Sequence, residues 1–148
     1  MTGEPLVILF VEDDANHAEL VLRSFQENQL ANRVVHLTDG AAALDYLFRS
    51  GPYADPATSP TPHLILLDLR LPKIDGLVVL RQIKEADHLR RIPVVILTTS
   101  QTGSDLADAY DRHANSYLVK PVDFAKLIQL VRDLKFYWLA WNHPPEHP

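Results

Sequence analysis

Five residues of the 148-residue chain carry groups that together could bind and transfer a phosphoryl group. Glu12, Asp13 and Asp68 are acids, Thr98 carries a hydroxyl and Lys120 is a cation, and each lies at the end of a short apolar run. Carboxylates about 4 Å apart repel by roughly 4 kcal/mol at an effective dielectric near 20, so such a cluster requires a cation or a proton. Ligands that are all oxygen favour Mg²⁺ or Mn²⁺ over zinc or copper. A metal, a nucleophile, a hydroxyl and an ammonium are the components of phosphoryl transfer.

Each acid by itself also has a simpler interpretation. Asp13 or Asp14 could cap a helix that follows it, and Asp68 could face solvent at the end of a strand. The interpretation as a site therefore depends on whether the fold brings all of these groups together.

The elements that would position the groups alternate along the chain. Short apolar runs predict strands, and apolar residues three and four positions apart predict helices between and after them. The predicted strands cover residues 6–11, 33–38, 63–68, 93–97 and 116–119. The first predicted helix has its apolar stripe over residues 18–25 and ends near residues 28–32. The others cover residues 41–49, 76–83, 105–113 and 123–141, with Asp123 as a cap of the last one.

Strands that alternate with helices at this spacing predict a doubly wound α/β fold. The fold is a five-stranded parallel sheet, covered on both faces and connected by right-handed crossovers. Ligands of such sheets bind outside the carboxyl ends of the strands. The acids, Thr98 and Lys120 all fall at predicted strand ends, so we expect them to meet at one edge of the sheet.

Composition excludes several classes of function. The absence of cysteine removes zinc-thiolate sites, iron–sulfur clusters and thiol nucleophiles. The 14 basic and 19 acidic residues give a net charge of -5, which argues against a nucleic-acid or anionic membrane surface. No run approaches the roughly 18 apolar residues of a membrane span, and the N-terminus lacks the features of a signal peptide. We therefore expect one cytoplasmic domain that binds neither nucleic acid nor membrane.

The order and spacing of these motifs resemble a two-component response-regulator receiver domain. The matching motifs are Glu12-Asp13, the segment 68–76 (DLRLPKIDG), Thr98 and the segment 117–121 (YLVKP). The resemblance covers roughly residues 5–135, so residues 1–135 are predicted to form the receiver domain. It implies the (βα)5 flavodoxin-like fold and a signalling phosphoacceptor that catalyses only its own phosphorylation and dephosphorylation.

The resemblance implies a nucleophile and a metal site. Asp68 would attack the phosphohistidine of a partner histidine kinase and become an aspartyl phosphate. Glu12, Asp13, Asp68 and the backbone carbonyl of Arg70 would hold Mg²⁺ or Mn²⁺. Many receivers have Asp where this chain has Glu12, so the longer arm would reach the metal directly or through a water.

The resemblance also implies a switch. Lys120 would pair with a phosphoryl oxygen, and Thr98 would move toward the phosphoryl group and leave space for Tyr117 to turn inward. A cis peptide bond is expected between Lys120 and Pro121. A simpler interpretation of Tyr117 is a half-exposed aromatic residue of a strand.

Two segments lie outside the regular alternation. Residues 51–62 (GPYADPATSPTP) contain four of the 11 prolines and predict an extended surface loop. Residues 136–148 extend the last helix with the aromatic residues Phe136, Trp138 and Trp141 and end in a proline-rich tail. We predict that this extension forms a homodimer interface, the alternative being that it folds back on its own domain.

The two segments together resemble the small response regulators that pair with cyanobacterial phytochromes, the Rcp type. That resemblance implies a phytochrome-type sensor histidine kinase as partner and a homodimer. Two alternative hypotheses for the chain are a Mg²⁺-dependent phosphatase of small molecules and an adaptor that is never phosphorylated. Such phosphatases need an acid two residues after the nucleophile, where this chain has Arg70, and an adaptor has no need for a cluster of repelling acids.

Overall fold

The structure is a computed structural model that describes residues 6–28, 33–98, 116–119 and 123–142. In residues 98, 119 and 134–142 it describes the backbone alone. The predicted helix over 105–113 and the residues Lys120 and Pro121 lie outside the described ranges.

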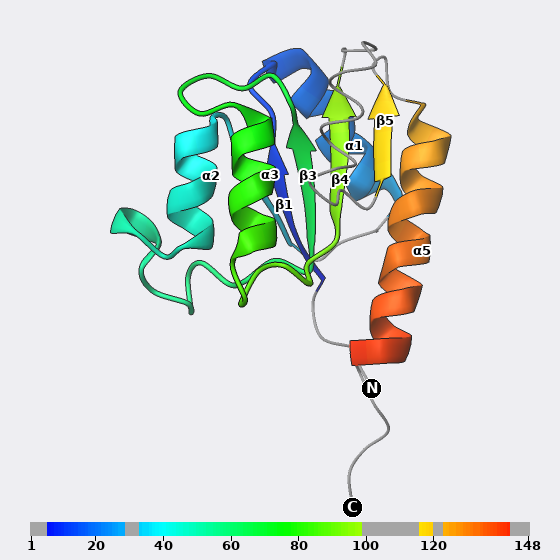
Figure 1. Ribbon diagram of the computed structural model, residues 1–148. Helices are drawn as coiled ribbons and strands as arrows, with labels where there is room; N and C mark the ends of the chain where they lie inside the picture. The colour runs from blue at the N-terminus through cyan, green and yellow to red at the C-terminus, as the bar shows by residue number, and fades with distance from the viewer. Residues whose placement is uncertain (1–5, 29–32, 99–115, 120–122, 143–148) are drawn as a thin grey trace, which may run out of the picture.

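The described strands form one parallel sheet in the order β2-β1-β3-β4-β5 (Figure 1). Their bounds are Val7–Val11 for β1, Arg33–Leu37 for β2, Leu64–Asp68 for β3, Val94–Thr98 for β4 and Ser116–Val119 for β5. Every residue of β1 and β3 is buried, as expected of central strands in a sheet that is covered on both faces.

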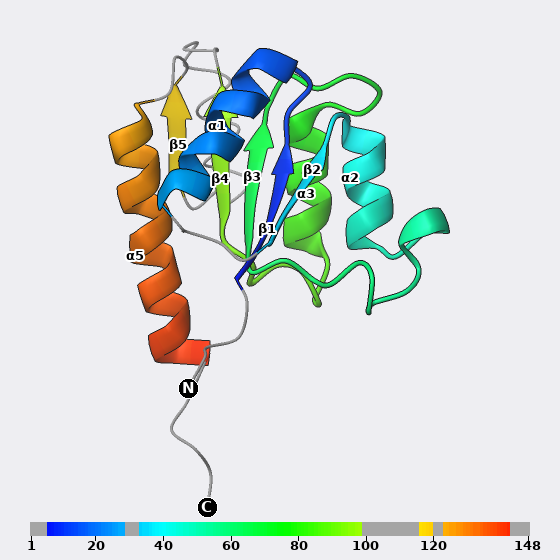
Figure 2. The same cartoon turned by 180° about the vertical axis from the view of Figure 1, so that it is seen from behind.

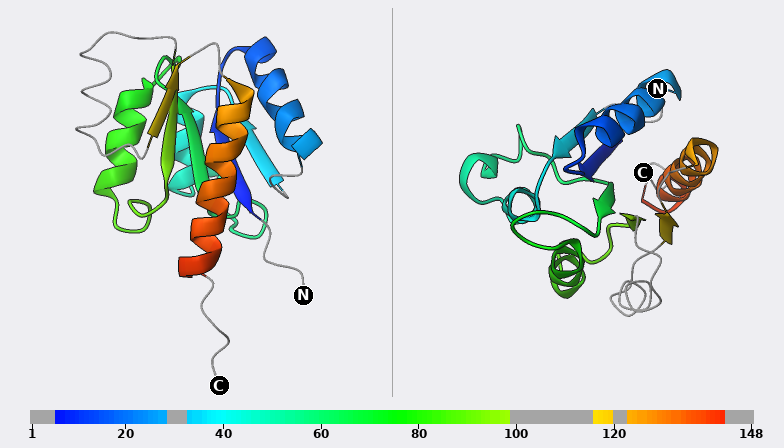
Figure 3. Two further views of the ribbon diagram at one scale, coloured as in Figure 1. Left: turned by 90° about the vertical axis from the view of Figure 1, so that its right-hand side faces the viewer. Right: turned by 90° about the horizontal axis from the view of Figure 1, so that it is seen from above.

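Helices cover both faces of the sheet. Their bounds are Ala15–Asn28 for α1, Gly40–Leu47 for α2, Gly76–Glu85 for α3 and Phe124–Asn142 for α5. Figure 2 shows α1 and α5 on one face, and Figure 3 shows α2 and α3 on the other. The predicted doubly wound α/β fold is confirmed.

Each face of the sheet has its own apolar core, because successive strand residues point to opposite faces. Leu9 and Val11 of β1 belong to the core under α2 and α3, while Ile8 and Phe10 belong to the core under α1 and α5. The buried residues of α3 are the predicted stripe, namely Gly76, Val79, Leu80 and Ile83.

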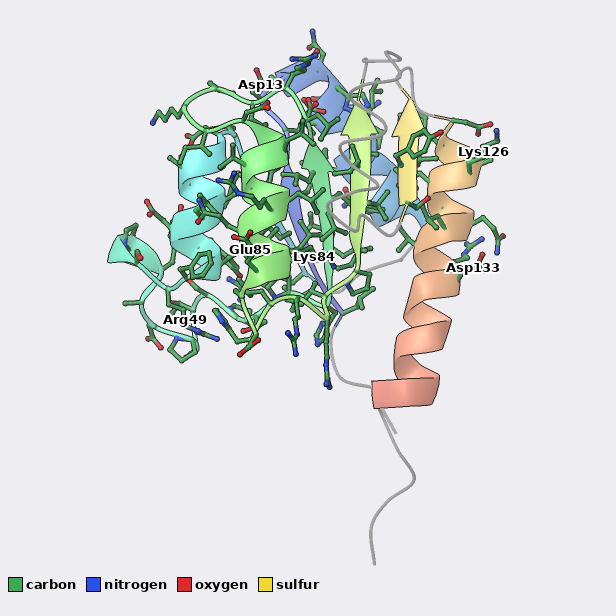
Figure 4. The ribbon with its side chains drawn as sticks, viewed as in Figure 1. Asp13, Arg49, Lys84, Glu85, Lys126 and Asp133 are labelled. Atoms are coloured by element: carbon green, nitrogen blue, oxygen red, sulfur yellow. The ribbon has the colours of Figure 1, made fainter. Side chains whose placement is uncertain are left out.

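The turn that leads from α3 into β4 is held by a lysine. Lys84 Nζ donates to the backbone oxygens of Arg90 and Ile92, both at 3.0 Å. Burial lowers the pKa of the Lys84 ammonium. The contact lies just before β4, the strand that ends at Thr98. Figure 4 labels Lys84 on α3.

The proline-rich segment 51–62 is more ordered than the predicted extended loop. It begins with a 3-10 helix, Gly51–Tyr53, and Ser59 inside it is buried. The Tyr46 hydroxyl donates to the Pro60 carbonyl at 2.6 Å, and Arg49 donates to the Thr61 hydroxyl at 2.7 Å. Side chains of α2 and its C-terminal end therefore hold the segment against the domain, which the loop composition alone does not reveal.

Replacing Tyr46 by Phe is expected to lower the free energy of unfolding by about 1 kcal/mol, the net value of one hydrogen bond. Burial raises the Tyr46 pKa above its ordinary 10.0, so the hydroxyl contribution is present below that pH and is lost as the pH rises toward the folded-state pKa. Urea unfolding near neutral pH measures the difference. Tyr53→Phe is the control, since the Tyr53 ring packs at 5.3 Å from Tyr46; an equal loss in both variants would contradict the assignment.

The last helix begins at its predicted cap and continues beyond the sheet. The Asp123 carboxylate accepts hydrogen bonds from the backbone N–H groups of Ala125 and Lys126, and Leu127 and Val131 are buried in the core. Figures 1 and 2 show that the C-terminal end of α5 passes the edge of the sheet opposite the carboxyl ends. Among the described residues, no helix combines the length and apolar character needed to span a membrane.

Candidate functional site

Three of the predicted site residues meet at the carboxyl edge of the sheet. Glu12 and Asp13 directly follow β1, and Asp68 is the last residue of β3. These strands are neighbours with Val11 opposite Leu67, so the acids that follow lie side by side. One carboxylate oxygen from each acid lies within 4.8 Å of the others. Figure 4 shows Asp13 at this edge, beside the start of α1.

The three acids differ in their exposure to solvent. Glu12 is 0% and Asp68 4% exposed, whereas Asp13 is exposed. Charges within 4.8 Å of each other repel by on the order of 3–4 kcal/mol per pair at an effective dielectric near 20. Two buried acids and one open acid therefore form a pocket of negative charge that solvent reaches from one side.

Backbone N–H groups orient the two buried carboxylates. Arg70 N donates to Asp68 Oδ1 at 3.0 Å, and Asp14 N donates to Glu12 Oε2 at 3.2 Å. Hydrogen bonds from neutral donors to an ionised acceptor are stronger than those between neutral groups. Each buried acid is thus held by the chain that immediately follows it.

Two histidines also contact Glu12, and the sequence patterns did not predict this. His17 Nδ1 lies 2.7 Å from Glu12 Oε1, and His36 Nε2 lies 2.9 Å from the Glu12 backbone oxygen. The His36 ring stacks on Phe10 with centroids 5.3 Å apart. Glu12 precedes α1 and lies five residues before His17, so helical spacing did not mark this contact in the sequence.

The capping interpretation is correct for Asp14. Its Oδ1 accepts the backbone N–H groups of Asn16 at 3.0 Å and His17 at 3.2 Å, which caps α1. Asp13, one residue earlier, contributes its oxygen to the acid cluster instead. Asp14 therefore caps α1, and Asp13 belongs to the acid cluster.

The chain after Asp68 turns sharply to begin α3, and Gly76 permits the turn. A Cβ atom at Gly76 would lie 2.2 Å from the Asp68 carbonyl oxygen and 2.7 Å from Leu69 Cα. Gly76 N donates to the Leu69 oxygen at 2.9 Å. The glycine that closes the segment 68–76 therefore lets the helix start pack directly against the backbone of Asp68.

The remaining predicted residues are described in part. Thr98 ends β4 and pairs with Val119 in the parallel ladder, one residue beyond the pair Asp68 and Leu97. The Thr98 side chain and all of Lys120 lie outside the described atoms. Tyr117 is half-buried and packs against the core under α2 and α3.

The acid cluster suits a hard divalent cation. Its donors are carboxylate oxygens from three residues, which is the chemistry of Mg²⁺ and Mn²⁺ sites. Glu12, Asp13 and Asp68 would hold the ion, which when bound offsets the repulsion among them and the charge of an incoming phosphoryl group.

Comparison with known proteins defines the class. Residues 8–132 match the response regulator receiver domain family, and the chain belongs to that family. It is a signalling protein with the flavodoxin-like receiver fold that its sequence motifs predicted.

Two curated regulatory proteins are similar to the chain over most of its length. The chain is 48% identical to the probable methanogenesis regulatory protein FilR2 of Methanothrix harundinacea, over 96% of this chain and 89% of FilR2. It is 42% identical to response regulator Rcp1 of Synechocystis sp., over 93% of this chain and 92% of Rcp1.

Two crystal structures share the fold at similar identity. The Mn²⁺-bound form of response regulator Rcp1 has a TM-score of 0.77 at 41% identity, covering 93% of this chain and 96% of that one. The phosphorylated cyanobacterial phytochrome response regulator RcpA has a TM-score of 0.78 at 38% identity, covering 92% and 95%. The predicted resemblance to the Rcp type is confirmed.

Proposed function

We propose that this response regulator accepts a phosphoryl group on Asp68 from the phosphohistidine of a sensor histidine kinase. The observation that carries the proposal is the meeting of Glu12, Asp13 and Asp68 within 4.8 Å at the carboxyl edge of the sheet. Phosphotransfer from an autophosphorylated kinase to the wild-type chain and to Asp68→Asn tests it.

In the proposed step an Asp68 carboxylate oxygen attacks phosphorus. A bond forms from this oxygen to phosphorus while the bond from phosphorus to the kinase imidazole nitrogen breaks, and the imidazole leaves with the electron pair. Arg70 N–H donates a hydrogen bond to Asp68 Oδ1 at 3.0 Å, and this contact orients the Asp68 carboxylate before the attack. The open side at Asp13 is where a bulky donor can approach.

The proposed switch uses the neighbouring strand ends. Lys120 would pair with a phosphoryl oxygen, Thr98 would hydrogen-bond to the group, and Tyr117 would turn inward. The Arg70 carbonyl would complete the protein ligands of Mg²⁺ or Mn²⁺. The position of Thr98 in the ladder, one residue past the pair Asp68 and Leu97, supports this arrangement.

The chemistry of the site favours a phosphoacceptor over a phosphatase of small molecules. The residue two positions after Asp68 is Arg70, which contributes a backbone N–H and cannot act as a general acid in that role. The two buried acids favour it over a constitutive adaptor, since burying like charges is costly without a ligand. The protein is thus proposed to catalyse only the gain and loss of its own phosphoryl group.

The exposed acid Asp13 allows a test of metal binding by substitution. Asp13→Asn is expected to weaken Mn²⁺ binding by about tenfold or more, because it removes one anionic ligand while leaving the buried core unchanged. Titration with electron paramagnetic resonance of free Mn²⁺ measures the affinity. Asp14→Asn retains a good helix cap and serves as the matched control; equal weakening in both variants would count against Asp13 as a ligand.

We further propose a phytochrome-type sensor kinase as the partner, in the cytoplasm and without nucleic acid or membrane. Similarity to Rcp1 and RcpA supports this choice, whereas similarity to FilR2 favours a sensor of another class as the second candidate. Phosphotransfer rates from a bacteriophytochrome kinase and from unrelated sensor kinases decide between them. A rate with the phytochrome kinase no faster than with the others would contradict the first choice.

We also propose that residues 136–148 extend the receiver domain and form a homodimer interface. The C-terminal end of α5 extends past the edge of the sheet (Figure 3). The sequence of this half of the helix contains Phe136, Trp138 and Trp141, whereas Leu127 and Val131, nearer its start, are buried in the core. An apolar helix segment that extends beyond its own domain favours burial against a second copy of the chain.

Truncation after Lys135 is expected to weaken dimerisation by about tenfold or more, because it removes the aromatic anchors of the interface. Light scattering across a concentration series measures the mass. Truncation after Asn142 is the control and retains the helix; a full-length dimer that survives the loss of 136–148 would contradict the proposed interface.

A further inference from the structure

We propose that His17 is a positioning residue that holds the Glu12 carboxylate in place for metal binding. The inference deepens the proposed function and rests on the metal site described above. It concerns a residue that lies on α1, outside the receiver motifs that the sequence matched.

The contact between the two side chains is short and buried. His17 Nδ1 lies 2.7 Å from Glu12 Oε1, and the side chains are 13% and 0% exposed. The other Glu12 oxygen, Oε2, accepts the Asp14 N–H at 3.2 Å. Each carboxylate oxygen therefore has its own donor, and the plane of the carboxylate is defined.

A glutamate at this position needs such support more than an aspartate would. The Glu12 side chain has one more rotatable bond than Asp13, so more conformers compete with the one that faces Asp68. A donor on α1 selects one of them. Hydrogen bonds that orient ligating carboxylates are part of the affinity of metal sites.

His17 is itself fixed at the start of its helix. The Asp14 side chain accepts the His17 backbone N–H at 3.2 Å, and the Asp14 backbone oxygen accepts Ala18 N at 2.9 Å. The cap therefore fixes the direction from which the imidazole approaches Glu12. One short segment supplies an acid of the cluster, the cap and the positioning ring.

The other ring nitrogen indicates that the contact with Glu12 determines the placement of the ring. His17 Nε2 is buried and has no hydrogen-bond partner among the described residues. A buried polar atom without a partner is costly and is uncommon in native proteins. The ring therefore keeps its short contact with Glu12 Oε1, at 2.7 Å, in a position that gives Nε2 no partner among the described residues.

Three substitutions separate positioning from simple packing. Asn carries its amide N–H where the imidazole has Nδ1, Gln carries it closer to the position of Nε2, and Ala carries none. His17→Ala and His17→Gln are expected to weaken Mn²⁺ binding about tenfold or more, while His17→Asn stays within about threefold of wild type. Electron paramagnetic resonance of free Mn²⁺ gives the affinity, and urea unfolding of each metal-free variant gives its stability.

The control is another histidine away from the acid cluster. His88 is exposed and contacts Phe48 edge-on at 5.5 Å, so His88→Ala is expected to leave the Mn²⁺ affinity unchanged. Rescue by Asn but not by Gln, at similar stability, supports positioning through Nδ1. Equal affinity of wild type and His17→Ala, or equal loss in the Ala and Asn variants, overturns the inference.

These outcomes are distinct from failure of the proposed function. A wild-type chain that binds no Mn²⁺, or binds it equally well as Asp13→Asn, contradicts the metal site itself. A wild-type chain whose Mn²⁺ binding depends on Asp13 but not on His17 contradicts the positioning role alone.

Discussion

Asp68→Asn is expected to lose all phosphorylation by phosphoramidate and Mg²⁺, whereas the wild-type chain gains one phosphoryl group. The amide keeps the size of the side chain and an oxygen for the Arg70 N–H, but it removes the anionic nucleophile. The variant also relieves the repulsion within the acid cluster, so its fold is expected to be at least as stable. Intact-mass spectrometry after incubation with the donor measures the phosphorylated fraction.

A matched substitution tests the specificity of that result. Asp45 is an exposed acid of α2, remote from the cluster, and Asp45→Asn is expected to be phosphorylated like wild type. Unimpaired labelling of Asp68→Asn would show that the phosphoryl group goes to another residue.

Gly76→Ala is expected to lower the free energy of unfolding by about 3 kcal/mol, through overpacking against backbone that has little room to move. The added methyl group would lie 2.2 Å from the Asp68 carbonyl oxygen, and the start of α3 would have to shift away from the end of β3. Because that shift moves the nucleophile, phosphorylation by the small donor is expected to fall as well. Urea unfolding and the rate of labelling measure the two effects.

A second glycine provides the comparison. Gly51 has a φ of 58° with nothing within 4 Å of an added Cβ, so Gly51→Ala costs conformational strain without a clash. Its expected loss is about 1 kcal/mol, with no change in labelling. An equal loss of unfolding free energy in the two variants would contradict a backbone clash as the cause of the loss in Gly76→Ala.

The sequence predicted much of the sheet and its helices because their signals are local. Apolar runs and stripes such as Val79, Leu80 and Ile83 follow directly from the need to bury one face of each element. The meeting of Glu12 and Asp68 was also predictable, since parallel strands place their carboxyl ends at one edge.

The contacts that tune the site were not predictable in the same way. The approach of His17 and His36 to Glu12 depends on how α1 and β2 pack beside β1, and a histidine outside a repeating pattern carries no local signal. Choosing between Asp13 and Asp14 for the cap likewise required the exact end of β1. The ordering of 51–62 by Tyr46 and Arg49 joins residues that only the folded chain brings together.

The arrangement of the strands is compatible with the proposed phosphorylation of Asp68. The Asp68 carboxylate, the proposed nucleophile, lies at the end of a fully buried strand, so its position is set by both cores of the domain. The groups proposed to respond, Thr98 and Tyr117, lie on the next strands, β4 and β5. A change in charge at Asp68 can therefore be transmitted across the sheet to another surface.

Localisation of the phosphoryl group within the chain tests whether Asp68 is the phosphoacceptor. The wild-type chain is treated with phosphoramidate and Mg²⁺, reduced with borohydride to convert any acyl phosphate to a stable alcohol, and digested for mass spectrometry. Reduction is expected at Asp68 alone, and no reduction is expected when a chelator removes the metal. A reduced residue elsewhere, or reduction at Asp68 that persists with the chelator, would contradict this expectation.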